Sequence, residues 1–140
     1  MTTLDATDRE LCTVRRQSTN TPLQALVLMN DDTWVEAARS LATRCLVDTV
    51  GDDSTTTDAQ RLTRAFRLLL ARQPASQELA VLQQTLAHYR QRFATAPGDA
   101  AKLIATGESP VDSSLDQTEL AAFTAVCSLL INLDETITRE

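Results

Sequence analysis

The sequence predicts an all-α fold, an irregular helical bundle of five or six helices with an apolar C-terminal helix at its centre. Apolar residues recur at helical spacing along almost the whole chain, and no stretch of useful length alternates as a half-buried strand would. The three Gly and four Pro fall between the helical runs, where they act as breakers. The hydrophobic fraction of 43% approaches the ~45–50% of globular domains, so a single domain over residues 1–140 can bury one core.

The first predicted helix is the apolar run "TPLQALVLM", residues 21–29, with its centre buried. Thr21 and Gln24 have the spacing of a capping box, and Pro22 occupies the first helical position, where its missing N–H costs no hydrogen bond. A polar segment, residues 1–20, precedes this helix.

A second helix is predicted over roughly residues 32–49, capped by Asp31 or Asp32. Helical spacing places one set of side chains on its inner face: Trp34, Val35, Ala38, Leu41, Ala42, Cys45 and Leu46. The outward set is Glu36, Arg39, Ser40, Thr43 and Arg44. Residues 50–57, which include "GDDSTTT", are predicted to be a flexible connection.

The third helix is predicted over residues 58–71, with Thr57 and Gln60 at capping-box spacing, and Pro74 stops it. Ser76 is the predicted cap of a fourth helix that reaches about Ala94.

A short helix follows over about residues 99–106, closed by Gly107. Asp116 caps the last helix, with Glu119 in capping-box register, and the residues from Leu120 to Leu133 are apolar almost all round. Such a helix normally occupies the centre of a bundle, and the tail beyond it is expected to fray.

Composition narrows the classes of function. The net charge is −6, and no clustered excess of positive charge suits a nucleic acid. The longest apolar stretch, residues 120–133, is too short to span a bilayer, and no signal peptide is visible. The three cysteines, Cys12, Cys45 and Cys127, are far apart. Cys45 and Cys127 lie among apolar helical residues and are expected to be buried, and one disulfide stays open. The sequence predicts no cofactor, because neither a metal-ligand cluster nor a haem-attachment motif occurs.

No catalytic residue is predicted. The candidate anion-binding or partner-binding residues flank the first helix, whose free N–H groups attract anions at its start. Arg9, Arg15, Arg16 and Asn20 precede the helix, and Asp31 follows it. The structural alternative, which is favoured, is that Thr21 and Gln24 cap the helix while the arginines pair with nearby acids. A weaker candidate surface is the outward face of the third helix: Arg61, Arg64 and Arg67. His88, the single histidine, is expected to be solvated or structural.

Three segments carry a family resemblance: "DRELCTVRRQSTNTPLQALVLMND", "FRLLLARQPASQEL" and "GESPVDSSLDQTELAAFTAVCSLLINLDETITRE". They resemble the closing part of a planctomycete-specific domain of unknown function, which often accompanies a planctomycete-type cytochrome c domain. The resemblance implies that this chain is the C-terminal portion of a larger family domain. Its partners would be the other domains of a longer protein or a c-type cytochrome, and its location exported or periplasmic as part of such a protein. The family offers no catalytic residues to carry over.

Three hypotheses follow, and whether the chain belongs to an enzyme stays open. The favoured one is a non-catalytic helical module, structural or interacting, of a larger exported protein. The second is one wall of a hydrolase-type active site, in which Arg15 and Arg16 recognise an anion and an upstream region supplies the rest. The third is an anion sensor on the face formed by Arg61, Arg64 and Arg67.

Overall fold

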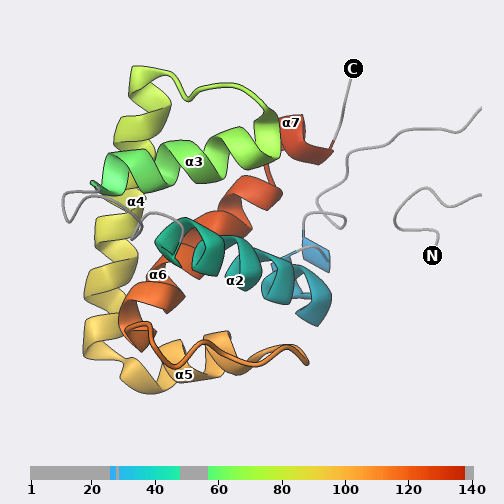
Figure 1. Ribbon diagram of the computed structural model, residues 1–140, viewed down its shortest axis with the longest axis vertical. Helices are drawn as coiled ribbons and strands as arrows, with labels where there is room; N and C mark the ends of the chain where they lie inside the picture. The colour runs from blue at the N-terminus through green and yellow to red at the C-terminus, as the bar shows by residue number, and fades with distance from the viewer. Residues whose placement is uncertain (1–25, 28, 48–56, 138–140) are drawn as a thin grey trace, which may run out of the picture.

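The computed structural model describes residues 26, 27, 29–47 and 57–137, and this part of the chain is an all-α helical bundle (Figure 1). The predicted fold class is therefore confirmed. The helices are α2 (Asp32–Val47), α3 (Asp58–Leu70), α4 (Ser76–Thr95), α5 (Pro97–Ala105), α6 (Gln117–Ile131) and α7 (Asp134–Ile137). No helix within the described ranges is long and apolar enough to cross a membrane.

Helix α6 packs against each of the other five named helices. Its buried residues are Leu120, Ala121, Ala122, Phe123, Thr124, Val126, Cys127, Leu130 and Ile131. The one polar side chain among them is satisfied locally, because the Thr124 hydroxyl donates to the Leu120 carbonyl at 2.7 Å. Helices α2 and α6 also contain small buried side chains, since Ala38 and Ala42 on α2 and Ala121 on α6 are all 0% exposed, and small residues let packed helices approach closely.

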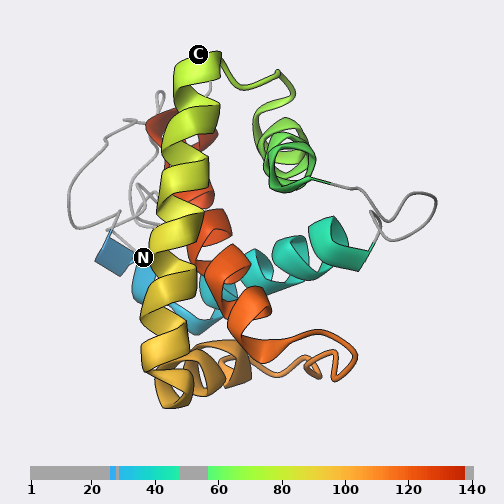
Figure 2. The ribbon, with the colours of Figure 1, turned by 90° about the vertical axis from the view of Figure 1, so that its left-hand side faces the viewer.

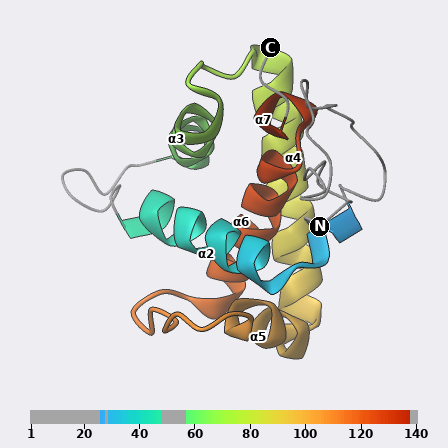
Figure 3. The same ribbon diagram turned by 90° about the vertical axis from the view of Figure 1, so that its right-hand side faces the viewer.

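The remaining helices surround this pair. Helix α4, the longest at 20 residues, runs along the long axis of the molecule beside α6 (Figure 2). Helices α3 and α5 lie near opposite ends of α4, and α2 crosses α6 between them (Figures 1 and 3). The buried hydrophobic residues of the described helices form one cluster.

The helix starts follow the sequence signals in part. Asp116 caps α6 as predicted, because its carboxylate accepts from the Glu119 N–H at 2.8 Å. The Gln60 side chain accepts from the Thr57 N–H at 2.9 Å, which is one half of the predicted capping box. The predicted cap of α4 is wrong by one residue: Ser76 is already helical, and the Glu78 carboxylate accepts from the Ala75 N–H at 2.6 Å.

Other corrections concern burial. Trp34, predicted to face the core, is 39% exposed, and Arg39, predicted to point outward, is 3% exposed. The helix predicted over 21–29 is described only at Leu26, Val27 and Met29, and of these Leu26 and Met29 are exposed rather than buried. The tail expected to fray contains one more helical turn, α7.

The polar segment 1–20 and Cys12 lie outside the described residues, as does the predicted connection 50–57 apart from Thr57.

Candidate functional site

Most of the predicted anion-binding residues lie outside the described part of the chain: Arg9, Arg15, Arg16 and Asn20. Asp31 is described, and it lies immediately before α2. Its carboxylate accepts from the Thr33 N–H at 2.9 Å, and its carbonyl accepts from the N–H groups of Trp34 and Val35. These contacts show that Asp31 caps the start of α2. Its role in anion or partner binding stays a prediction.

The three arginines predicted to share an outward face of α3 are not equally exposed. Arg67 is exposed, whereas Arg61 and Arg64 are half-buried. The charge of Arg61 also contributes, after the larger effect of Arg90, to lowering the pKa of Asp58. An anion at this face would have to compete with contacts inside the protein.

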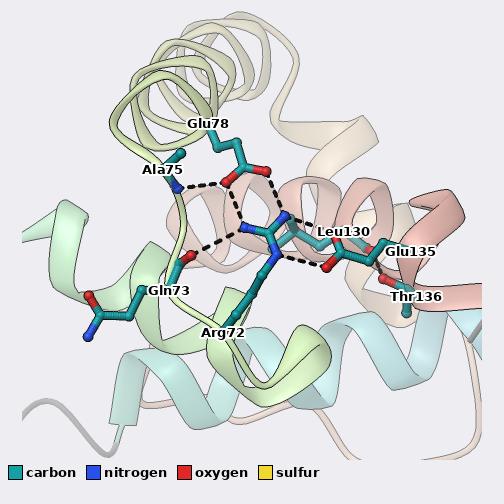
Figure 4. A network of polar contacts seen from close by, with 7 residues as sticks. All are labelled: Arg72, Gln73, Ala75, Glu78, Leu130, Glu135 and Thr136. Carbon is teal, nitrogen blue, oxygen red and sulfur yellow. Dashed lines mark hydrogen bonds and ion pairs between the residues drawn. The ribbon is translucent and has the colours of Figure 1, made fainter. Parts of the chain in front are cut away.

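Arg72 joins the α3–α4 connection to the C-terminal helix (Figure 4). It follows Ala71, which ends α3 with a left-handed φ of 57°. The guanidinium donates two hydrogen bonds to the carboxylate of Glu78, at 2.8 and 2.9 Å, and two to that of Glu135, both at 2.7 Å. Its carbon lies 4.7 Å from the centroid of the Phe66 ring, within cation–π range. Arg72 therefore holds α4 and α7 to the end of α3.

These contacts change the titration of both acids. Hydrogen bonds from Arg72 are the main reason that the pKa of Glu78 falls to about 2, with a smaller contribution from the Ala75 N–H. The same guanidinium lowers the pKa of Glu135. All three side chains are well exposed to water, which screens the attraction, so we assign the network a role in placing α7 more than in bulk stability.

Arg90 makes a second junction, among three helices. From α4 its guanidinium donates to Asp58 at the start of α3, Nη2 to Oδ1 at 2.9 Å, and to Glu119 in the first turn of α6, Nε to Oε2 at 2.8 Å. Both carboxylates stand at helix N-termini, where the helix dipole favours negative charge. The hydrogen bonds from Arg90 lower the pKa of Asp58. The guanidinium carbon also lies 5.9 Å from the Phe123 ring centroid.

The third junction ties α2 to the loop after α5. Buried Arg39 donates to the Ile104 carbonyl and, at 2.8 Å, to the Ser109 carbonyl. One turn earlier, the Glu36 carboxylate accepts from the N–H groups of Glu108 and Ser109, both at 3.0 Å, and from the Ser109 hydroxyl. Gly107 allows this approach: its φ is +97°, and a Cβ there would stand 2.8 Å from the Glu36 Cβ.

Sequence reasoning missed these three arginines, although signals for two of them were present. Arg39 is four residues after Val35 and three before Ala42, so helical spacing puts it on the apolar face. Arg72 and Glu135 stand in two of the segments that carry the family resemblance, and the structure brings them together. Nothing in the spacing along the chain indicates that Arg90 meets Asp58 and Glu119.

One apolar groove remains to be described. It lies among Met29, α2, α4, α5 and α6, has a volume of about 290 Å³ and is partly open to solvent. Apolar side chains dominate its lining: Met29, Val35, Tyr89, Phe93, Leu103, Ala125 and Leu129. Tyr89 and Phe93 stack with their ring centroids 6.0 Å apart, and Arg92 and Asp99 supply charge at the groove. We call this feature the α4–α6 groove.

The described residues contain no group of three or more His, Cys, Asp or Glu side chains that could hold a metal ion. Cys45 and Cys127 are both buried, and burial is the main reason that the pKa of the Cys127 thiol is raised.

Fold and contacts together define a helical-bundle domain in which arginine junctions join the helices. The chain belongs to the PSD1 family of proteins of unknown function (DUF1553), whose family model matches residues 1–86. No curated protein and no solved structure matches the chain. The matched range ends inside α4, so α6 lies beyond it, although α6 contacts every other named helix.

Proposed function

We propose that this chain is a non-catalytic helical module, with a structural or docking role, of a larger exported planctomycetal protein. One observation carries the proposal. In the described part of the chain, Arg39, Arg72 and Arg90 each direct their guanidinium groups at two or more partners from other helices or loops. Arginine suits anionic ligands because of its planar fork of donors, and here that capacity serves to hold helices in place.

The charges of the acids support the same proposal. Glu78, Glu135 and Asp58 all have pKa values lowered by arginine, so they are ionised at neutral pH and poor proton donors. A general acid or base at neutral pH needs the opposite, a pKa brought toward 7. A cytochrome-associated setting is part of the proposal and comes from the family resemblance stated above.

The experiment is a thermal unfolding curve of the 140-residue chain by circular dichroism, with its mass measured in solution. A module that folds on its own gives a cooperative, strongly helical transition at a single mass. A broad transition with aggregation would show that these helices fold only together with the rest of the longer protein, and would overturn the proposal that this chain is a module by itself.

A second experiment separates the module from one wall of an active site. In the longer family protein, the combined substitution Arg15→Ala and Arg16→Ala is compared with Arg39→Met. The proposal expects that the longer protein fails to assemble with Arg39→Met, because the helical module is destabilised. It expects normal assembly with Arg15→Ala/Arg16→Ala. Loss of a turnover activity in Arg15→Ala/Arg16→Ala, with an unchanged melting temperature, would favour the enzymatic alternative.

A further inference from the structure

The α4–α6 groove exposes apolar and aromatic side chains to solvent. Tyr89, on α4, is half-buried and stacks on the buried Phe93, with the two ring centroids 6.0 Å apart. On α6 the lining includes the small side chains of Ala125 and Ser128 beside the larger Leu129. Small residues let packed helices approach closely, and apolar surface left in water costs roughly 25 cal/mol for each Å². The groove therefore favours contact with another protein surface.

Two charged side chains at this groove have no partner in the part of the chain that the structure describes. Arg92 lies in the last turn of α4, Asp99 lies in the first turn of α5, and both are exposed. Within the described ranges, neither side chain has a hydrogen bond or an ion pair, with the other or with any further residue. In contrast, Arg39, Arg72 and Arg90 each hold two or more partners. The groove thus combines a cation with an anion, and the described fold uses neither.

We propose that the α4–α6 groove is the interface with a second copy of this chain. A two-fold axis brings the same patch of both copies together, so that the first residue of a pair contacts the second in both directions. A patch with one cation and one anion is self-complementary in that arrangement, because Arg92 of each copy can pair with Asp99 of the other. A groove with charges of only one sign would repel its own copy.

The two kinds of side chain have different roles in this dimer. The apolar lining supplies the stabilisation, with Tyr89 at its centre, since aromatic side chains contribute most to protein interfaces. The cross-pairs of Arg92 with Asp99 fix how the copies are oriented. The net charge of −6 makes two copies repel at long range, and the groove adds nothing to that repulsion because its charges cancel.

The test is sedimentation equilibrium of the full 140-residue chain over a range of concentrations, in which the unmodified chain is expected to form dimers as its concentration rises. Arg92→Glu and Asp99→Arg each turn both cross-pairs into repulsive pairs. Each is expected to raise the dissociation constant of the dimer about tenfold or more. The two variants mixed in equal amounts should dimerise with each other, and the double variant Arg92→Glu/Asp99→Arg should dimerise with itself, because opposite charges then meet again.

Arg44→Glu is the matched control, because it makes the same change of charge at an exposed position of α2 that does not line the groove. It should leave the dissociation constant unchanged, and circular dichroism checks that every variant is folded. A dimer that the single reversals do not weaken, or one that neither the mixture nor the double variant restores, would overturn the proposal.

A chain that stays monomeric at every concentration would also overturn it, and would leave the groove to another domain of a longer protein. The proposal goes beyond the function proposed above, and the two fail separately. A monomer that unfolds cooperatively refutes the dimer and leaves the helical module intact.

Discussion

The junction at Arg39 supports a quantitative prediction for the substitution Arg39→Met, which keeps an unbranched apolar stem and removes the guanidinium with its charge. Arg39 is 3% exposed and donates to the carbonyls of Ile104 and Ser109. A hydrogen bond from a charged donor contributes about 1.5–3 kcal/mol, and a buried acceptor left without a partner costs about 1–3 kcal/mol.

Ser109 is exposed, so water can satisfy its carbonyl after the substitution, whereas Ile104 is buried. Ile104 is also in the last turn of α5, whose negative dipole end favours a cation by about 0.3–1 kcal/mol. Counting the Ile104 bond in full, the Ser109 bond at about half its value and the dipole contribution, we expect a loss of about 2.5–5.5 kcal/mol in the free energy of unfolding. For 140 residues this lowers the melting temperature by roughly 8–19 °C.

The assay is urea unfolding followed by circular dichroism and extrapolated linearly to water. Arg44→Met is the control, since it removes the same charge from an exposed position of the same helix and should change the stability by less than about 0.5 kcal/mol. If Arg39→Met is no more destabilising than Arg44→Met, the reasoning about the buried guanidinium is refuted.

Two further predictions use the same assays. Gly107→Ala forces a side chain into a positive φ and into contact with Glu36, so we expect a loss of about 1–3 kcal/mol in the free energy of unfolding. The control is Gly98→Ala in α5, which has open space around it and should be neutral or stabilising. Equal effects of the two substitutions would contradict this prediction. Acid should weaken the Arg72 network: the folded pKa of Glu78 is lowered to about 2, so its contribution is present above about pH 4.5 and is lost as the pH falls toward 2. Glu78→Gln should remove that part of the pH dependence of the melting temperature, and an unchanged acid limb would count against the network.

Much of the fold is encoded in local sequence. The helical periodicity, the breakers and the Asp116 cap are short-range signals, and α2, α3, α4 and α6 begin within a residue of their predicted starts. Local signals succeed here because caps and turns depend on residues three or four positions apart. Such residues are close together whatever the rest of the chain does.

What the sequence did not reveal is which side chains meet across the bundle. Arg90 contacts residues 32 and 29 positions away, and Arg39 contacts residues 65 and 70 positions away. A polar residue is assigned to solvent by default, because burying a charge costs several kcal/mol unless partners compensate it. Arg39 is buried because α5 and the α5–α6 loop supply those partners, the carbonyls of Ile104 and Ser109. The sequence by itself determined which segments are helices; only the tertiary structure decided which arginines join them, because those partners converge through packing and not through spacing along the chain.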